Sequence, residues 1–342
     1  MGGSFSDQEP VIVAIIGYRN NDDVYECLSA LAKVTEKTFL ISICENGGAG
    51  SYHELCDRLK DLVDFEGGAP NTVDVRVAQA CGGTLRTGGQ VVRIYRARDN
   101  LGYAGGINVC IGQLTLTEKW SALWVLNPDT EPDPNALTAL IKRTREGEYG
   151  IVSSRLVFKS TGRVQSYGGH WRPLMARGLN IGQNASLDVV PDFDAIELSM
   201  NYVSGASLFA TREYVESVGL MDERYFLYCE EVDWCFRRGH RRLGYAHDAI
   251  VYHAHGTTTG SSADPKERSS ISVYLNERNK LLLTKRFYPT LYPLVLATTL
   301  LLTLQYLKCG AVRNFFVALS GWFAGAQGEE GPPKGFDCSG TG

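Results

Sequence analysis

The sequence predicts an α/β protein with a mostly parallel β-sheet flanked by helices and a helical appendage at its C-terminus. Short, almost wholly apolar runs rich in β-branched residues, such as Val11–Ile16, are typical of strands buried on both faces. These runs alternate with stretches of helical periodicity, which is the order expected of a parallel sheet with helical crossovers. Beyond residue 266 the patterns are helical and apolar.

The first half of the chain contributes the parallel part of the sheet. Strands are expected at 11–16, 39–44, 91–95 and 122–126, and helices at 24–31, 51–62, 107–117 and 135–144. Residues 64–90 interrupt this rhythm, because they are rich in Gly and Thr and alternate in polarity only over 72–77. We expect them to form an inserted loop or hairpin.

The second half has a more mixed pattern. Strands are expected at 151–158, 164–167, 203–210 and 249–252, a loop-rich segment at 170–200 and a helix at 268–288. Two apolar blocks follow, at 291–307 and 314–326. The first carries no formal charge but is short for a bilayer span, which needs about 20 apolar residues. We expect both blocks to form helices that pack on the domain or lie on a membrane surface.

Bulk properties exclude several classes of protein. The 342 residues suit one large domain with an appendage, or two domains, and the net charge of −4 gives no support for a nucleic-acid partner. Nine scattered cysteines without a C-x-x-C pair favour reduced thiols in a cytosolic protein over a disulfide framework or a zinc site. The polar segment 1–10 has no apolar signal region.

An acidic cluster stands out near residue 230. Glu230, Glu231 and Asp233 place three carboxylates within four positions, among aromatic and apolar neighbours. Like charges repel, and apolar surroundings raise the cost of ionisation. A general base with a tuned pKa, or a site for a cation, would use such an arrangement. The structural alternative is a helix start, where acids face the positive end of the dipole; both can hold at once.

Polar and small residues follow four of the expected strands, at 17–20, 45–48, 99–108 and 127–130. Ligands of open α/β sheets collect at the carboxyl ends of strands. The segment 99–108 is a glycine-rich turn that opens a helix, where backbone N–H groups can approach a phosphate. It matches neither a Walker loop nor G-x-G-x-x-G, so a plain tight turn accounts for it equally well.

Three further residues are candidate metal ligands. Asp129 follows a strand and could bind a hard divalent cation, although its proline-rich surroundings also fit a turn. His253 and His255 occupy alternating positions just beyond the expected strand 249–252, so both rings could face one way. A metal or phosphate contact and a purely structural role remain equal alternatives for this pair.

Taken in order, these blocks resemble the inverting glycosyltransferases of family 2 and, more narrowly, their rhamnosyltransferase-like branch. The resemblance runs from about Val11 to Gly260. Each block is modest alone, but the ordered set is specific. The matching blocks are Tyr18-Arg19-Asn20, Glu45-Asn46-Gly47, residues 100–108, 126–129, 203–206 and 219–223, Tyr228-x-Glu-Glu-x-Asp233 and His253-x-His255-Gly256.

The resemblance implies a GT-A fold, which is a Rossmann-like, mostly parallel sheet flanked by helices, and a role for each block. The nucleoside and the nucleotide cleft would be formed by Tyr18, Arg19, Asn20, Glu45, Asn46, Asn100, Gly102, Tyr103, Gly105, Gly106, Asn108 and Asn127. Asp129, with His255 or as second choice His253, would bind Mg²⁺ or Mn²⁺ that bridges the diphosphate. Glu231 would be the general base, with Glu230 and Asp233 holding the acceptor or orienting the base.

The activity that this family implies is sugar transfer with inversion from a nucleotide-diphosphate donor, dTDP-rhamnose by resemblance. The acceptor would be a hydroxyl of a cell-surface polysaccharide or a lipid-linked glycan. Residues 1–266 would form the catalytic domain, and 267–342 a helical region that contacts the inner face of the cell membrane. The apolar tail could equally serve a homodimer.

Two residues depart from the family pattern. Asn127 replaces the first acid of the metal-binding D-x-D, and Glu231 replaces the usual Asp. A nucleotidyltransferase is disfavoured, because residues 18–20 make a poor phosphate-gripping loop. A non-catalytic nucleotide-sugar-binding or scaffold protein with a decayed site is the other alternative. The retained carboxylates of the acidic cluster, with Asp129 and His255, argue against decay.

Overall fold

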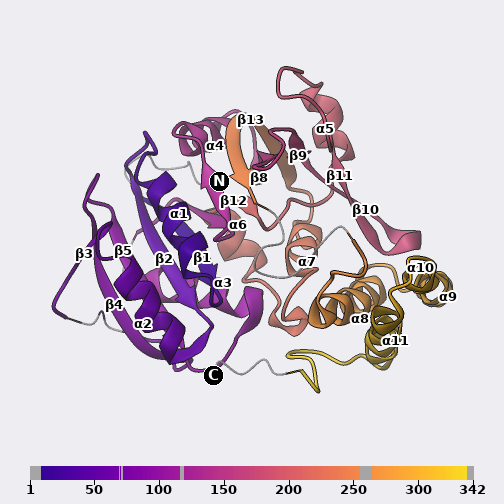
Figure 1. Cartoon of the computed structure of the whole chain (residues 1–342). Coiled ribbons are helices and arrows are strands. Elements are labelled where there is room, and N and C mark those ends of the chain that lie inside the picture. The colour runs from indigo at the N-terminus through magenta and orange to yellow at the C-terminus, as the bar shows by residue number, and fades with distance from the viewer. Residues whose placement is uncertain (1–8, 69, 71, 116–118, 255–263, 337–342) are drawn as a thin grey trace.

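The computed structural model describes residues 9–68, 70, 72–115, 119–254 and 264–336. Within these ranges, eleven strands form one sheet with the order β3-β4-β5-β2-β1-β6-β12-β8-β13-β7, and β9 pairs with β8. Helices cover both faces of this sheet, and a group of C-terminal helices lies at one end of the molecule (Figure 1). The predicted α/β fold with a C-terminal helical appendage is therefore confirmed.

The centre of the sheet is parallel, as its apolar strands predicted. β1 (Val11–Gly17) pairs in parallel with β2 (Phe39–Glu45) and β6 (Ala122–Leu126), and β2 pairs in parallel with β5 (Val91–Ala97). Every residue of β1, β2 and β6 is buried, because both faces of these strands are covered.

Helices cover the two faces of β1 in the alternation that a strand dictates. Val11, Val13 and Ile15 pack with α1 (Asn21–Leu31), α2 (Gly48–Arg58) and α4 (Ala136–Arg145). The intervening Ile12, Ala14 and Ile16 pack with α3 (Gly102–Thr115). The chain thus crosses from one face to the other, and the loops at the carboxyl ends of β1, β2 and β6 meet at one edge of the sheet.

The second half of the sheet is mixed. β12 (Ser207–Thr211) runs antiparallel to both β6 and β8 (Tyr149–Phe158), while β13 (Arg242–His253) pairs in parallel with β8. Two short strands, β7 (Thr130–Pro132) and β9 (Val164–Ser166), pair antiparallel with β13 and β8. The strand expected at 249–252 is longer than predicted, and the one expected at 203–210 begins only at Ser207.

Residues 64–90 do form a hairpin, which extends the sheet at one edge. β3 (Val63–Phe65) pairs antiparallel with β4 (Val77–Leu85), and β4 pairs antiparallel with β5. The alternating segment 72–77 contributes only Val77, because Val73 and Val75 are exposed and have no face to cover. Asp74 accepts hydrogen bonds from the backbone and guanidinium of Arg76, which curls this segment into a turn.

The segment 170–200, expected to be loop-rich, contains regular structure. β10 (Gly168–Arg172) and β11 (Arg177–Ile181) form a separate antiparallel pair joined by the 3₁₀ turn η1 (Pro173–Met175), and α5 is Phe193–Ser199. This hairpin depends on tertiary contact: Tyr202 packs against Gly169, where a Cβ would collide with its ring. A strand that packs through a glycine against a distant aromatic ring lacks the alternating apolar pattern by which a strand is recognised in the sequence.

Three short elements connect β12 to β13: α6 (Arg212–Val218), η2 (Glu223–Tyr225) and α7 (Glu230–Phe236). The C-terminal helices are α8 (Ser270–Phe287), α9 (Tyr292–Leu302), α10 (Leu304–Lys308) and α11 (Val312–Gln327). Leu281 and Leu283 of α8 and Val295 of α9 belong to the same buried cluster as α3 and β1. The appendage therefore shares the core of the sheet, and a domain boundary near residue 266 stays a prediction.

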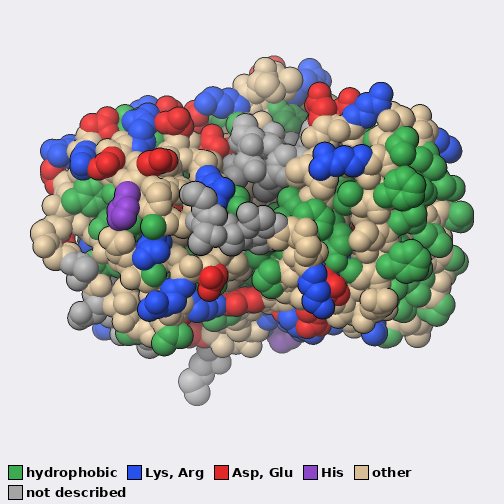
Figure 2. Space-filling view, turned by 60° about the horizontal axis from the view of Figure 1, so that its bottom comes forward, with side chains coloured by type: hydrophobic (Ala, Val, Ile, Leu, Met, Phe, Trp, Pro, Cys, Tyr) green, Lys and Arg blue, Asp and Glu red, His purple; other side chains and the backbone are tan. Residues whose placement is uncertain are grey.

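The outer surface of the appendage is apolar. Exposed Leu, Phe and Val side chains gather at one end of the molecule, whereas charged side chains dominate the other end of the same view (Figure 2). Those of the C-terminal helices are Leu294, Leu300, Leu301, Leu304, Leu307, Val312, Phe316 and Phe323. Within the described part of the chain, no helix combines the length and apolarity that crossing a bilayer requires.

Candidate active site

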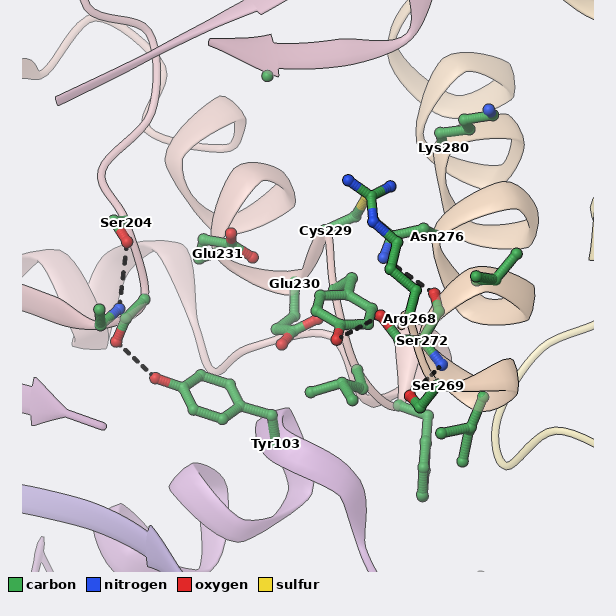
Figure 3. A pocket seen from close by; sticks show the side chains of 18 of the residues that line it. Tyr103, Ser204, Cys229, Glu230, Glu231, Arg268, Ser269, Ser272, Asn276 and Lys280 are labelled. Carbon is green, nitrogen blue, oxygen red and sulfur yellow. Dashed lines mark hydrogen bonds between the residues drawn. The ribbon is translucent and has the colours of Figure 1, made fainter. Parts of the chain in front are cut away.

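A cavity of about 1030 Å³ lies at the carboxyl ends of the parallel strands and continues toward α8. One wall carries residues that follow strands of the sheet: Tyr18, Asn46, Asn100, Gly102, Tyr103, Asn127 and Asp129. The opposite wall comes from the β10–β11 hairpin, α8 and α10. Glu230 and Glu231, at the start of α7, lie between the two walls (Figure 3). The cavity thus has two halves separated by a pair of carboxylates.

The glycine-rich turn before α3 is fixed by close backbone contacts. Gly102 has φ +70°, and a Cβ there would collide with the carbonyl oxygen of Phe226, so both conformation and space require glycine. Asn46 donates from Nδ2 to the Gly102 carbonyl at 3.0 Å, which ties this turn to the loop after β2. Tyr103 donates its hydroxyl to the Gly205 carbonyl at 2.6 Å. The predicted residues Asn46, Gly102 and Tyr103 are therefore brought together.

Three of the predicted nucleoside-binding residues support the loops rather than line the cavity. Glu45 is buried, and its Oε1 accepts from the backbone N–H groups of Gly47 at 2.7 Å and Arg19 at 3.3 Å. Burial raises the pKa of Glu45, and these two backbone donors oppose the rise. Asn20 accepts from the backbone N–H of Tyr18 at 2.9 Å. Glu45, Arg19 and Asn20 thus shape the loops that present Tyr18 and Asn46.

Gly105, Gly106 and Asn108 also lie outside the cavity lining, on the packed side of α3. A Cβ at Gly106 would come within 2.8 Å of Ile16 Cδ1, so this glycine lets α3 approach β1. Asn108 accepts from the Met221 backbone N–H at 3.1 Å and donates to the Met221 carbonyl at 2.9 Å. These residues anchor α3 and the loop near 221; nucleotide contact by them stays a prediction.

The two carboxylates between the halves of the cavity are held in apolar surroundings. Glu230 is 3% exposed, and among the described residues its Oε2 has no hydrogen-bond partner. Burial, and secondarily the adjacent Glu231 carboxylate, hold the pKa of Glu230 well above its usual range. Burial likewise raises the pKa of Glu231, which is partly exposed. Carboxyl groups with raised pKa values are suited to accept a proton near neutral pH.

The loop before α7 has an unusual backbone. Phe226, Tyr228 and Cys229 have φ values of +64°, +72° and +76°, a region that non-glycine residues rarely adopt. Such conformations persist where surrounding structure holds them, and they often mark functional sites. Here α8 provides that hold, since the Asn279 side chain donates to the carbonyls of residues 225, 227 and 228 at 2.8, 2.7 and 3.0 Å.

Asp233, the third acid of the cluster, lies away from the cavity. Its side chain is fully buried and forms ion pairs with Arg237 Nε and Arg286 Nη1, each at 2.6 Å. The Tyr225 hydroxyl donates to the same carboxylate at 3.1 Å. With every oxygen occupied by these partners, Asp233 joins α7 to α8, and a direct contact with the acceptor stays only a prediction. The sequence cluster therefore divides into two cavity residues and one anchor.

Asp129 and His253 form a polar pair in the sheet half of the cavity. His253 Nε2 lies 3.2 Å from Asp129 Oδ1, with the two side chains 6% and 5% exposed. His253 Nδ1 lies 2.8 Å from Gln165 Oε1, and a carbonyl oxygen favours the tautomer that donates from Nδ1. An imidazole nitrogen and a carboxylate oxygen placed this close could both coordinate one cation.

This pair fits a divalent metal ion that takes its other ligands from substrate. An imidazole nitrogen and a carboxylate suit Mn²⁺, and Mg²⁺ is commonly held by one or two carboxylates together with substrate phosphates and water. No group of three or more His, Cys, Asp or Glu side chains that could hold a metal occurs in the part of the chain that the structure describes. His255, the preferred second ligand, lies outside the described residues.

Several cavity residues gave no sequence signal. Gln165, Trp171 and Tyr202 come from strands or loops whose polar or aromatic residues look ordinary in isolation, and Arg268 and Lys280 come from α8 and its N-terminal approach. They reach the cavity only because the β10–β11 hairpin and α8 close it. The burial of Gln165, which calls for a partner to its amide, became visible only in the structure.

The chain is similar to known proteins both in sequence and in structure. No family model matches the chain. The low-salt glycan biosynthesis hexosyltransferase Agl10 of Haloferax volcanii is 22% identical over 201 residues, covering 59% of this chain and 62% of that protein. The N-acetylglucosaminyl-diphospho-decaprenol L-rhamnosyltransferase of Mycobacterium tuberculosis is 27% identical over 210 residues, covering 55% and 68%. The chain thus covers less than two thirds of the length of the archaeal relative.

Solved structures extend the comparison across almost the whole chain. The mannosyltransferase PcManGT from Pyrobaculum calidifontis, in complex with GDP-Man and Mn²⁺, has a TM-score of 0.51 and 12% identity, covering 95% of this chain and 77% of that one. GalNAc-T7 with UDP, GalNAc and Mn²⁺ has a TM-score of 0.55 and 12% identity, covering 93% and 57%. The chain therefore has the GT-A fold, and its sequence relatives are glycosyltransferases, one of them a rhamnosyltransferase.

Proposed function

We propose that this protein is a metal-dependent inverting glycosyltransferase that moves a sugar from a nucleotide-diphosphate donor to an acceptor hydroxyl. The observation that carries the proposal is one cavity in which the Asp129–His253 pair and the carboxylates Glu230 and Glu231 lie together at the carboxyl ends of parallel strands. An electrophile held at the first pair and a hydroxyl held at the second would meet between the two halves.

The donor occupies the half formed by the sheet. Tyr18 and Asn46 hold the nucleoside, and the turn at Asn100 and Gly102 lies along the diphosphate, where backbone N–H groups are available. Asp129 and His253 hold the divalent ion, which when bound supplies neutralisation of the charge on the departing diphosphate. The similar structures contain GDP-Man or UDP with Mn²⁺. The name of the mycobacterial relative supports a rhamnosyl donor such as dTDP-rhamnose.

The acceptor occupies the half bounded by α8 and the β10–β11 hairpin. Glu231 removes the proton from its hydroxyl as the oxygen attacks the anomeric carbon, and the bond to the diphosphate breaks on the opposite face. Attack from that side inverts the configuration. Burial raises the pKa of Glu231, which makes its carboxylate a stronger proton acceptor than an exposed glutamate. Glu230 is the second choice of base, and its unpartnered Oε2 suits it to hold a second acceptor hydroxyl.

The acceptor belongs to a cell-surface polysaccharide or a lipid-linked glycan, reached by peripheral contact with the inner face of the membrane. Residues 287–328 include Lys308 and Arg313 but no acidic residue. Their exposed apolar side chains, among them Leu301 at 65% and Phe316 at 64%, form the face seen at one end of Figure 2. An apolar face with positive and no negative charge suits the interface of an anionic bilayer.

The first test is thermal stabilisation by a panel of nucleoside diphosphates and nucleotide sugars, each with and without Mn²⁺. The expected result is a rise in Tm that is selective for one base and larger with metal, since a ligand that binds only the folded state stabilises it. Asp129→Asn should abolish the metal-dependent part. No response from any nucleotide, in a folded sample, would instead support a non-catalytic protein with a decayed site.

Membrane contact is tested separately by flotation with vesicles of phosphatidylglycerol and phosphatidylcholine. Wild type should float with the vesicles, and the double variant Leu301→Glu, Phe316→Glu should remain in solution with its Tm retained. Light scattering in the absence of vesicles checks the competing use of this face. A dimer that the same two substitutions dissociate, with no flotation of wild type, would assign the face to a second copy of the chain.

A further inference from the structure

The acceptor half of the cavity is lined by basic side chains. Arg177 of β11, Arg268 just before α8 and Lys280 of α8 all contribute to it. In Figure 3 the guanidinium group of Arg268 lies between Glu231 and Lys280, above the first turn of α8. A sugar hydroxyl at Glu231 does not require a neighbouring group of cations, so these residues indicate a further chemical group on the acceptor.

The two arginines act on the same buried phenol. Burial raises the pKa of Tyr306, Glu277 adds to the rise, and Arg268 and Arg177 oppose it. Tyr306 and both arginines line the same cavity. Lys280 forms an ion pair with Glu277, and the two side chains are 11% and 6% exposed, so their charges offset each other. Arg177 and Arg268 add further cationic side chains to the lining of this region.

Neutral donors line the same region. Trp171 is 5% exposed, and its indole N–H has no acceptor among the described residues. Asn276 and Ser269 of the α8 segment also line the cavity. A buried donor without an acceptor is costly, which favours a ligand that accepts hydrogen bonds. Positive charge and N–H or O–H donors around one space define a site for an anion.

We propose that Arg268 and Arg177, supported by Lys280 and Trp171, bind a phosphate or diphosphate group carried by the acceptor. The planar guanidinium fork matches phosphate oxygens and binds them in pairs. This assignment rests on the proposed transferase function for its acceptor role. It is distinct from the donor diphosphate, which belongs to Asp129 and His253 on the other side of the carboxylates.

The mixed lining of the cavity agrees with a phosphate that links a sugar to a hydrocarbon chain. Apolar side chains also line the cavity, among them Met175 of η1 and Leu302 of α9. The Thr298 hydroxyl donates to the Leu174 carbonyl at 3.0 Å, which joins η1 to α9 beside the exposed apolar face. The cavity thus offers a carboxylate for a hydroxyl, cations for a phosphate and apolar side chains for a hydrocarbon chain.

The test measures binding of three probes in EDTA, which removes the metal needed at the donor half. Farnesyl diphosphate, farnesol and inorganic pyrophosphate are titrated into the full chain by calorimetry. We expect farnesyl diphosphate to bind at least about tenfold more tightly than farnesol, and the double variant Arg177→Gln, Arg268→Gln to lose about tenfold or more. Arg86→Gln, on the distant edge hairpin, is the matched control and should bind as wild type does.

The probes separate the sources of the phosphate. Pyrophosphate binding that equals farnesyl diphosphate, and that still needs the two arginines, would assign the site to a soluble sugar phosphate. Binding that survives the double variant but is lost in Asp129→Asn would place the anion in the donor half and overturn the proposal. Farnesol that binds as tightly as farnesyl diphosphate would also overturn the proposal. So would a folded wild-type protein that binds neither farnesyl diphosphate nor pyrophosphate.

Failure of this inference can be told apart from failure of the transferase function. The nucleotide panel with Mn²⁺ measures binding in the donor half, and the titration in EDTA measures binding in the acceptor half. Nucleotide binding without arginine-dependent phosphate binding would leave the transferase function standing and remove the phosphate subsite. The Tm of each variant, measured beside wild type, shows that a loss of binding reflects the site rather than unfolding.

Discussion

Asn279 Nδ2 lies 2.7 Å from the carbonyl oxygen of Leu227, and through this bond α8 holds the loop that leads into Glu230. The same amide reaches the carbonyls of residues 225 and 228, and Arg278 Nη2 donates to the carbonyl of Tyr225 at 3.0 Å. Both α8 side chains are fully buried. A helix that looks like part of an appendage thus positions the carboxylates of the cavity.

Asn279→Ala should lower kcat far more than it weakens donor binding. The three carbonyls would lose their common donor, and the left-handed residues 226, 228 and 229 would relax, moving the carboxylates of α7. A displacement of about 1 Å can cost about 100-fold in rate. Steady-state kinetics with the identified donor measures the kcat and KM effects separately. Lys285→Ala, at an exposed position of the same helix, is the control, and an equal loss in both variants would contradict the positioning role.

Asp233→Asn should destabilise the fold rather than remove the general base. It would leave Arg237 and Arg286 beside a neutral amide, and breaking a buried ion pair typically costs about 3–5 kcal/mol. Urea unfolding of the variant measures this loss. Turnover per folded molecule should remain well above that of Glu231→Gln. A stable Asp233→Asn protein without activity would return this residue to the acceptor site.

The acid limb of the pH–rate profile should lie above pH 4.5, which is the ordinary pKa of a glutamic acid side chain. Burial raises the pKa of both Glu230 and Glu231, and the base must be deprotonated to act, so turnover rises with pH through the raised value. The Glu231 charge adds to the pKa of Glu230, whereas the rise in the pKa of Glu231 comes from burial, so Glu230→Gln should leave the limb of Glu231 in place. A limb that moves to lower pH in this variant would show instead that Glu230 is charged when the base titrates.

The same pKa shift makes a prediction for stability. The folded state keeps a proton on Glu230 at pH values where the unfolded chain has lost it, so folding is favoured less as pH rises from about 4.5 through the raised pKa. Glu230→Gln lacks this contribution, and its Tm should therefore fall less than that of wild type over this range. Differential scanning calorimetry at stepwise pH checks the slope. A steeper fall in the variant would contradict the assigned direction.

Cys81 should be the thiol most readily alkylated near neutral pH among the half-buried cysteines. Its Sγ lies 3.3 Å from Cys56 Sγ, and this contact lowers the pKa of Cys81 to about 7 by stabilising the thiolate. Alkylation by iodoacetamide at pH 7 followed by peptide mapping measures the rates. Cys56→Ala should slow labelling of Cys81, since the thiolate then loses its donor. Faster labelling in that variant would mean that Cys56 only shields its neighbour.

Local patterns in the chain were sufficient to predict the parallel centre of the sheet. The runs at 11–16, 39–44 and 122–126 are apolar throughout because both faces are covered, and burial on both faces is a property that each strand displays by itself. The hairpin β10–β11 could not be found in this way. Its strands are partly exposed and rest on Tyr202, a residue outside the hairpin whose contact only the folded chain creates.

The candidate site divides in the same manner. Glu230, Glu231 and Asp129 were visible in the sequence, because carboxylates crowded together or set after a strand are unusual wherever they occur. Their partners were not visible: Gln165 beside His253, Asn279 beside Leu227 and the arginines of the acceptor half come from distant segments. The order of the motifs was enough to indicate the fold and the chemistry of a glycosyltransferase.

The tertiary structure alone decided which members of a motif face the ligand. Asp233 stands three residues after Glu230 in the chain, yet its carboxylate turns to Arg237 and Arg286 while Glu230 and Glu231 enter the cavity. Glu45 Oε1 likewise accepts from the Gly47 backbone N–H, and the Asn108 amide pairs with the Met221 backbone. The sequence determined which groups carry charge and in what order, whereas their direction was set by the partners that packing placed beside them, since a buried polar group must be satisfied.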